Sequence, residues 1–255
     1  MNGANLPATG EPLQAKETLP QAGEPKLQTN LDTNFIKLVA ILSMVVDHFG
    51  AAFFPQYPVF RWIGRLAFPL FCYCLTVGML YTHNIQKYFL RLGAFALISQ
   101  PFWILAFNAD DFLGNLFNLN IFFTLLVSLA AAWGFKEKKW WLFLGGFLLL
   151  SLINFDYSIT GLVLILIFYL CRNTPWLGAL LFTLYYLPAL NGYMEDPLAL
   201  KIGGHAIGFE IFCLLALPFI YIHTNIKPKI SKWVFYAFYP AHLLVIFLLQ
   251  LAIPQ

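Results

Sequence analysis

Charged side chains are scarce in this sequence. Asp, Glu, Lys and Arg make up 11% of its 255 residues, whereas soluble domains carry about 25%. The apolar excess is general, because the mean hydropathy of the whole chain is +0.72. These values exclude an ordinary soluble domain and indicate an integral membrane protein with one membrane domain.

Basic clusters and metal-ligand patterns are also missing. The net charge is only +3, and no stretch concentrates enough Lys and Arg to bind a phosphate backbone, so we expect no nucleic-acid partner. The four cysteines lie in apolar runs and are expected to be small buried residues. Cys72 and Cys74 lack a second ligand pair, and no histidines have ligand spacing, so we expect no metal site.

Apolar and aromatic residues dominate what is present. Hydrophobic residues make up 60% of the chain, which includes 27 Phe, 12 Tyr and 7 Trp. Because a bilayer span needs about 20 mostly apolar residues, the sequence predicts an all-α fold, a polytopic transmembrane bundle of about nine helices. The bundle should occupy residues 32–255. The spans are predicted near 34–54, 60–81, 88–107, 116–134, 139–154, 157–171, 175–190, 206–223 and 233–252.

Residues 1–31 have a different composition. They are rich in Pro, Gly, Gln, Glu and Lys and contain few large apolar side chains. Such a segment cannot bury enough apolar surface to offset the entropy of folding. We predict a disordered tail, and the loop charges place it in the cytoplasm.

Basic and acidic residues alternate between successive loops. With a cytoplasmic N-terminus, the inside segments hold most of the Lys and Arg residues, and the outside segments hold acidic residues such as Asp110, Asp111 and Asp156. This pattern follows the positive-inside rule at every loop but the first. An odd number of spans then predicts a C-terminus on the opposite side of the membrane.

The first span contains Lys37, Asp47 and His48. Ionisable groups at membrane depth are functional candidates, although Lys37 could simply extend to the interface and Asp47 and His48 could serve helix packing. Lys37 and His48 are eleven residues apart, so they share a helix face and lie roughly 16 Å apart along the axis. Asp47 is rotated about 100° from His48 and can meet a different neighbour.

Two arginines follow in the second span. Arg61 and Arg65 are four residues apart and share a helix face. An arginine paired with Asp47 would neutralise two costly charges, although Arg61 is also typical of an interfacial anchor. Pro69 removes a backbone hydrogen bond and should kink this helix.

Further polar groups such as Asp156 fall at similar outer depth, and His242 lies near the middle of the last span. Together they indicate a polar cavity that opens outward. Histidine can act as a base or nucleophile, a carboxylate such as Asp47 or Asp156 can orient it, and arginine can stabilise negative charge. This inventory suits acyl transfer or a proton relay in a transporter, and the residues alone do not decide between them.

Several stretches resemble the TraX family of conjugal-transfer pilin acetylases. Residues 34–108 carry the most specific likeness, in Phe35-Ile36-Lys37-Leu38-Val39-Ala40 through Asp47-His48 and in Gly64-Arg65-Leu66-Ala67-Phe68-Pro69-Leu70-Phe71. Later, more apolar matches are 120–126, 161–166 and 232–243.

The resemblance implies an N-acetyltransferase of the bacterial inner membrane. Its donor would be acetyl-CoA, its acceptor the N-terminal amine of a pilin subunit, and its C-terminus would be periplasmic. The family is also distantly similar to membrane acyltransferases that O-acetylate glycans, which carry a basic residue, ten residues and then a histidine, as Lys37 and His48 do. By that likeness His48 is the catalytic candidate, with Asp47 and Arg65 beside it. Lys37, Arg61, Asp156 and His242 are possible additional site residues.

Three alternatives stay open. An O-acetyltransferase for a periplasmic or surface glycan would use the same chemistry on a different acceptor. A proton-coupled transporter needs polar residues in both leaflets, yet the inner halves of the spans are nearly bare apart from Lys37. An assembly factor without chemistry would leave the buried charges with packing roles only.

Overall fold

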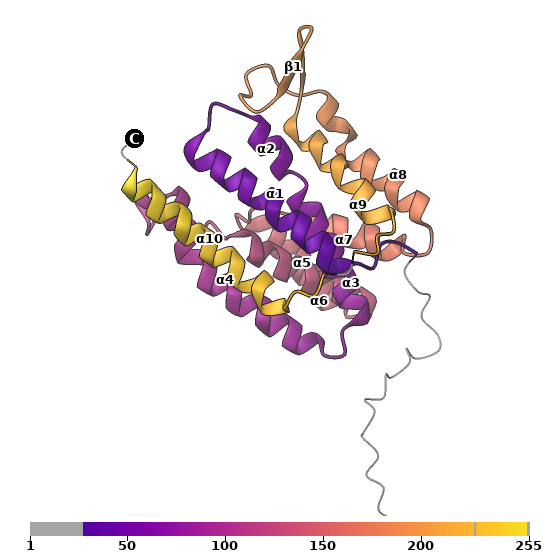
Figure 1. Cartoon of the computed structure of the whole chain (residues 1–255). Helices are drawn as coiled ribbons and strands as arrows, with labels where there is room; N and C mark the ends of the chain where they lie inside the picture. Colours follow the sequence, from indigo (N-terminus) through magenta and orange to yellow (C-terminus); the bar gives the residue numbers. More distant parts are fainter. Residues whose placement is uncertain (1–27, 227, 254–255) are drawn as a thin grey trace, which may run out of the picture.

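Helices account for most of the computed structural model, which describes residues 28–226 and 228–253 (Figure 1). The predicted count of about nine is confirmed, because the described residues form nine apolar helical segments that coincide with the predicted spans. Four of them are long and apolar enough to cross a membrane, and the other five have 10–17 residues. The chain is therefore a multi-pass membrane protein.

The α-helices follow the predicted spans in order. They are α1 (Thr33–Phe53), α2 (Val59–Gly64), α3 (Ala67–Tyr81), α4 (Ile85–Phe107), α5 (Ile121–Lys136), α6 (Trp140–Leu152), α7 (Thr160–Leu170), α8 (Pro175–Tyr186), α9 (Leu217–Tyr221) and α10 (Lys232–Ala252). Short 3-10 helices are η1 (Ala109–Asp111), η2 (Leu187–Leu190) and η3 (Phe209–Ala216). In Figure 1, α10 lies along α4, and α5 and α7 lie inside the bundle.

The fold is not entirely helical, which corrects the predicted all-α class. Strands β1 (Leu200–Ile202) and β2 (His205–Ile207) form an antiparallel hairpin that projects from one end of the bundle (Figure 1). Gly203 and Gly204 connect them with φ values of 57° and 82°, and two successive positive φ values suit the tight hairpin turn that glycine favours. The predicted span at 206–223 therefore becomes helical only from Phe209.

The predicted second span is divided into α2 and α3 by Arg65 and Leu66. Pro69 explains the position of the break. It has no N–H to donate to the carbonyl of Arg65, four residues earlier, and its ring crowds that carbonyl. The expected kink is therefore a short turn centred on Arg65, and it sets the direction of this side chain.

Helices α1 and α2 pack closely because glycines stand where they meet. A Cβ atom on Gly64 would lie 2.0 Å from Oδ1 of Asp47, and one on Gly50 would lie 2.1 Å from Cβ of Phe60. Only residues without a side chain allow this approach. The close contact brings the carboxylate of Asp47 to the start of the α2–α3 break.

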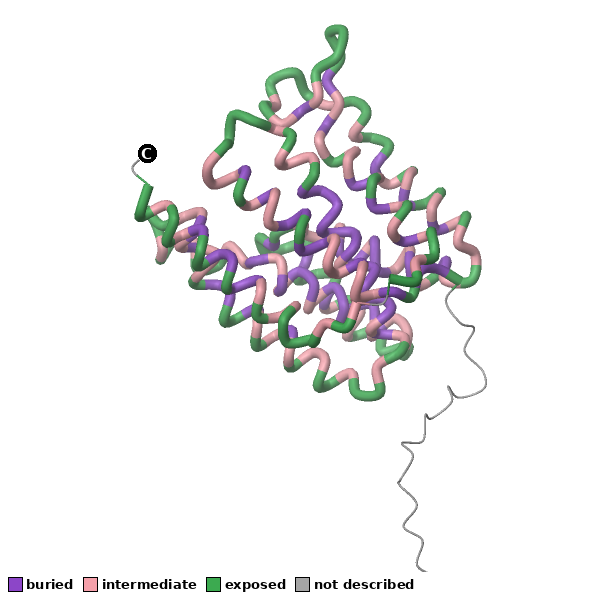
Figure 2. Tube along the Cα trace, viewed as in Figure 1, coloured by how far each residue is buried: buried purple, intermediate pink, exposed green. Residues whose placement is uncertain are grey.

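Buried residues concentrate in the centre of the bundle, and exposed residues lie on its outside (Figure 2). Many of the exposed residues have large apolar side chains. Val245, Leu248 and Leu251 on α10 and Trp141 and Leu152 on α6 are each more than half exposed. This distribution suits helices whose outer faces contact lipid. All four cysteines are buried and free, as the sequence predicts.

Most of the predicted tail, up to residue 27, lies outside the described residues. Its last four residues, 28–31, belong to the packed structure. The hydroxyl groups of Thr29 and Tyr73 are 2.7 Å apart, and the Asn30 amide donates a hydrogen bond to the Phe219 carbonyl. Residues 28–31 thus pack against the bundle that was predicted to begin at residue 32.

Candidate active site

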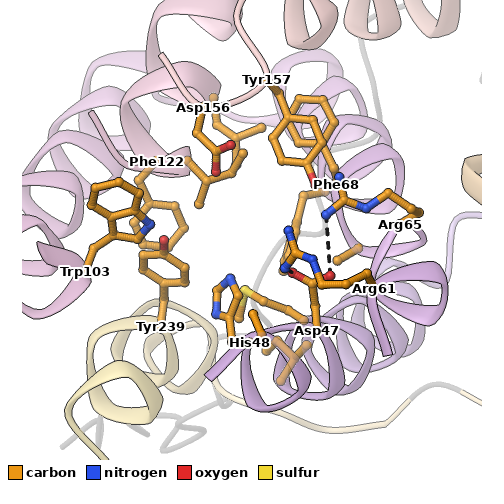
Figure 3. A pocket seen from close by; sticks show the side chains of 18 of the residues that line it. Asp47, His48, Arg61, Arg65, Phe68, Trp103, Phe122, Asp156, Tyr157 and Tyr239 are labelled. Carbon is orange, nitrogen blue, oxygen red and sulfur yellow. Dashed lines mark hydrogen bonds and ion pairs between the residues drawn. The ribbon is translucent and has the colours of Figure 1, made fainter. Parts of the chain in front are cut away.

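A cavity of about 250 Å³ lies between α1, the α2–α3 break, α4, α5, α10 and the loop between α6 and α7. Five of the predicted site residues line it: Asp47, His48, Arg61, Arg65 and Asp156. Figure 3 shows these side chains around one space, with aromatic rings filling the gaps between them. The structure thus brings together residues from three distant parts of the chain, as the predicted polar cavity requires.

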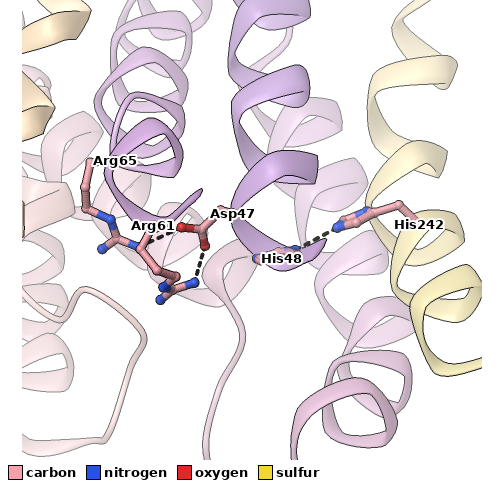
Figure 4. A network of polar contacts seen from close by, with 5 residues as sticks. All are labelled: Asp47, His48, Arg61, Arg65 and His242. Carbon is pink, nitrogen blue, oxygen red and sulfur yellow. Dashed lines mark hydrogen bonds and ion pairs between the residues drawn. The ribbon is translucent and has the colours of Figure 1, made fainter. Parts of the chain in front are cut away.

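Asp47 lies between two guanidinium groups. Arg61 donates a hydrogen bond to Oδ2, and Nη2 of Arg65 lies 3.4 Å from Oδ1 (Figure 4). The side chains of Asp47 and Arg65 are 9% and 8% exposed, so each removes much of the cost of burying the other charge. The predicted arginine–aspartate pair is confirmed, with both arginines taking part.

Arg65 has further contacts and unused hydrogen-bonding capacity. Its guanidinium lies 5.2 Å from the ring of Tyr157 and 4.8 Å from the ring of Phe209. Such stacking holds the plane of the guanidinium in place. Its buried Nε has no hydrogen-bond partner among the described residues, so Arg65 can bind another acceptor.

Within the described residues, His48 pairs with a histidine rather than with Asp47 or Asp156, the two carboxylates that could have oriented it. Its Nδ1 lies 2.7 Å from Nε2 of His242 on α10. The two rings are nearly parallel, with centroids 5.0 Å apart. Asp47 points away from His48 toward the arginines (Figure 4), because consecutive helical residues are rotated by about 100°.

The hydrogen bonds define the protonation pattern of the two rings. Nδ1 of His242 lies 3.0 Å from the carbonyl oxygen of Phe238, which can only accept, so this nitrogen carries a proton. With both rings neutral, Nε2 of His242 accepts from Nδ1–H of His48. Nε2 of His48 then keeps a free lone pair beside the cavity.

Asp156 reaches the cavity from the loop between α6 and α7 (Figure 3). The loop is tied to the start of α5, because the Asp156 N–H donates to the Leu119 carbonyl and the Thr124 hydroxyl donates to the Asp156 carbonyl. Enclosure by the cavity walls raises the pKa of Asp156 to about 6, although Arg65 opposes the shift. The carboxyl can therefore gain or lose a proton near neutral pH.

Tyr157 is a site residue that the sequence did not reveal. Its φ is 62°, and that of Ser158 is 43°, values that cost energy in residues other than glycine. This backbone places the Tyr157 ring against Arg65 and 4.0 Å from the centroid of Phe68. No motif marks the position, because the strain arises from the loop geometry.

Lys37 is the one predicted site residue that does not join this group. It lines a second cavity, nearer the start of α1. No group of three or more His, Cys, Asp or Glu side chains within 28–226 and 228–253 is placed to hold a metal ion. The arrangement around His48 offers a base or nucleophile, two cations and a titratable acid, which together suit acyl transfer.

The chain matches the model of one protein family and parts of two individual proteins. The family model described as "TraX protein" matches residues 32–250. A "Probable fimbrial assembly protein FimC, serogroup H1" from Dichelobacter nodosus is 38% identical over 105 residues, which cover 38% of this chain and 43% of that protein. An uncharacterised protein from Rickettsia prowazekii (strain Madrid E) is 38% identical over 40 residues, 16% of each chain.

The aligned part is less than half of the length of these curated relatives. No solved structure matches the chain. The family match, by contrast, extends over nearly all of the described residues and includes both cavities.

Proposed function

Because this chain belongs to the TraX family, we propose that it is a membrane acetyltransferase that moves the acetyl group of acetyl-CoA to the N-terminal amine of a pilin subunit. The observation that carries the proposal is the pairing of His48 with His242. It leaves one nitrogen of His48 unprotonated beside a cavity that also contains two arginines. The name of the fimbrial assembly relative supports a pilin acceptor.

In the proposed reaction, the amine nitrogen of the acceptor attacks the carbonyl carbon of the thioester. Nε2 of His48 takes the proton that the amine loses. Negative charge develops on the carbonyl oxygen, and Arg65, whose Nε has no partner among the described residues, stabilises it. The carbon–sulfur bond then breaks, and the leaving thiolate takes the proton from His48, which restores the neutral ring.

The two substrates reach the cavity from opposite sides of the membrane. Acetyl-CoA is made in the cytoplasm, and the positive-inside pattern puts the start of α1 on that side. The pilin amine arrives from the periplasm, near the loop that contains Asp156. In this orientation the tail is cytoplasmic and the C-terminus is periplasmic, in the inner membrane of a bacterium.

The test uses purified full-length protein with acetyl-CoA that carries a labelled acetyl group. Acceptors are a peptide with a free N-terminal amine, the same peptide with a blocked amine, and a glycan oligosaccharide. We expect label only on the free-amine peptide, and His48→Ala should lower the rate by about a hundredfold or more. His83→Ala is the matched control, since His83 is exposed in a loop.

Two results would contradict the proposal at different levels. Normal turnover by His48→Ala would remove His48 from the chemistry. Label on the glycan rather than the peptide would retain the acetyl transfer but replace the acceptor. Absence of any transfer by folded wild-type protein would refute the enzyme assignment as a whole.

A further inference from the structure

The second cavity, of about 360 Å³, is lined by three cations from three helices. Lys37 comes from α1, Arg91 from α4 and Lys232 from the first turn of α10. We propose that this cavity binds the phosphate groups of the acyl donor, while the acyl group lies in the cavity beside His48. This inference rests on the proposed function and assigns it a second binding site.

The charge of this cavity is unbalanced. None of its lining residues is an Asp or Glu. Among the described residues, none of the three cations makes an ion pair with a carboxylate. Like charges that line one space without a counter-charge repel one another, so the arrangement favours an anionic ligand that carries more than one charge.

Arg91 provides the most specific sign of a missing partner. Its Nε is buried and has no hydrogen-bond partner within the described residues, a situation that costs free energy unless a ligand supplies an acceptor. Arginine binds phosphate oxygens through several N–H groups at once. Hydroxyl groups of Thr33, Thr82 and Tyr88 line the same space and can donate further hydrogen bonds.

The two cavities are neighbours inside the bundle. Phe71, Phe122, Leu125 and Phe235 line both of them, so the boundary between the two spaces is apolar. Lys37 and His48 lie on the same helix, roughly 16 Å apart along its axis. A ligand that fits both spaces has an anionic end, an uncharged chain and a reactive group at the far end.

A coenzyme A thioester has this order of parts. Its nucleotide phosphates would bind Lys37, Arg91 and Lys232, its uncharged pantetheine arm would pass between the phenylalanines, and its thioester would reach His48. Anionic phospholipids also carry a phosphate and apolar chains. The phosphate chemistry is shared, so the experiment must separate the two sources.

The experiment measures binding without turnover. Full-length protein in nanodiscs of neutral lipid is titrated calorimetrically with free coenzyme A, with dephospho-coenzyme A and with pantetheine. We expect coenzyme A to bind at least tenfold more tightly than pantetheine, with dephospho-coenzyme A between them. Arg91→Gln should weaken coenzyme A binding at least tenfold and leave pantetheine binding unchanged.

Matched variants control for folding and for general charge. Lys87→Gln removes an exposed cation one turn earlier on α4 that does not line the cavity, and it should change nothing. Lys232→Gln changes an exposed residue at a helix start and should weaken coenzyme A binding without affecting thermal unfolding. Equal affinity of wild type and Arg91→Gln for coenzyme A would overturn the inference, as would equal affinity of wild type for coenzyme A and pantetheine.

A lipid arm tests the other source of phosphate. Phosphatidylglycerol is titrated into the neutral nanodiscs, and its binding is compared between wild type and Arg91→Gln. Arg91-dependent binding of this lipid, with no Arg91-dependent binding of coenzyme A, would assign the cavity to a headgroup and overturn the inference. If acetyl transfer is unchanged in Arg91→Gln, the phosphate site is refuted and the proposed function is retained. If coenzyme A binding depends on Arg91 but no acetyl transfer occurs, the phosphate site is retained and the proposed function is refuted.

Discussion

Replacement of Asp47 by Asn should destabilise the protein more than any other single removal of a charge. The carboxylate is 9% exposed and is the hydrogen-bonded counter-charge of both Arg61 and Arg65. Asn keeps the shape and one acceptor oxygen but removes the charge. Arg65, whose side chain is 8% exposed, would then be a buried cation without its main partner.

The magnitude follows from the geometry. Removal of one partner of a buried ion pair costs about 3–5 kcal/mol. Because Asn retains one acceptor oxygen, we expect the free energy of unfolding to fall by about 3 kcal/mol. Arg61 adds less, because its side chain is 27% exposed and solvent screens it. The free energy of unfolding should therefore fall mainly through Arg65.

The assay is reversible unfolding in mixed micelles with increasing dodecyl sulfate, followed by the fluorescence of the seven tryptophans. Asp110→Asn is the control, because Asp110 is exposed in η1. In a double-mutant cycle, Asp47→Asn with Arg65→Gln should cost less than the sum of the single variants by about 1–3 kcal/mol. A loss below about 0.5 kcal/mol for Asp47→Asn, or strict additivity, would refute the reasoning.

Three further predictions follow from the cavity beside His48. His242→Ala should lower kcat for the proposed acetyl transfer by about a hundredfold with little change in KM, because His48 loses the hydrogen-bond acceptor that orients its ring. Gly64→Ala should reduce the free energy of unfolding by about 1–3 kcal/mol, because its Cβ would lie 2.0 Å from Asp47 Oδ1. The pKa of Asp156 is raised to about 6, above that of an unfolded aspartate. Its contribution to stability is therefore full below about pH 4 and is lost as the pH rises through about 6.

Each of these predictions has a control variant or a result that would contradict it. An unchanged kcat for His242→Ala would separate the histidine pair from catalysis. Gly145→Ala is the match for Gly64→Ala, since a Cβ at Gly145 meets nothing within 4 Å, and it should be neutral or slightly stabilising. Asp156→Asn should abolish the loss of stability between pH 4 and 7, measured by the same unfolding assay, and a wild-type-like pH profile in that variant would contradict the assignment.

The sequence predicted the helices well because the relevant signal is local. Apolar runs and the spacing of charged loops determine where helices can lie in a membrane. Within one helix, periodicity also predicted that Asp47 and His48 point to different neighbours. The same reasoning placed Arg61 and Arg65 on one face, where both reach Asp47.

The partner of each side chain across distant segments was only partly predictable from the sequence. The His48–His242 pair joins residues 194 positions apart, and no local pattern says that a histidine rather than a carboxylate would meet His48. The position of Lys37 was also misleading, because a shared helix face does not imply a shared cavity. Two loop features, the strained backbone at Tyr157 and the hairpin turn at Gly203, depend on dihedral angles that composition does not specify.

The five short helices have a consequence for the membrane around the protein. Helix α6 has 13 residues, which makes it roughly 20 Å long, and its exposed apolar side chains face outward, whereas the hydrocarbon core of a bilayer is about 30 Å thick. Lipids beside such short apolar elements are drawn inward and the bilayer thins locally. The membrane is therefore thinnest beside α6, which packs against α5, and α5 lines the cavity beside His48. A substrate that enters the cavity near this face has less hydrocarbon to cross than it would in an undisturbed bilayer.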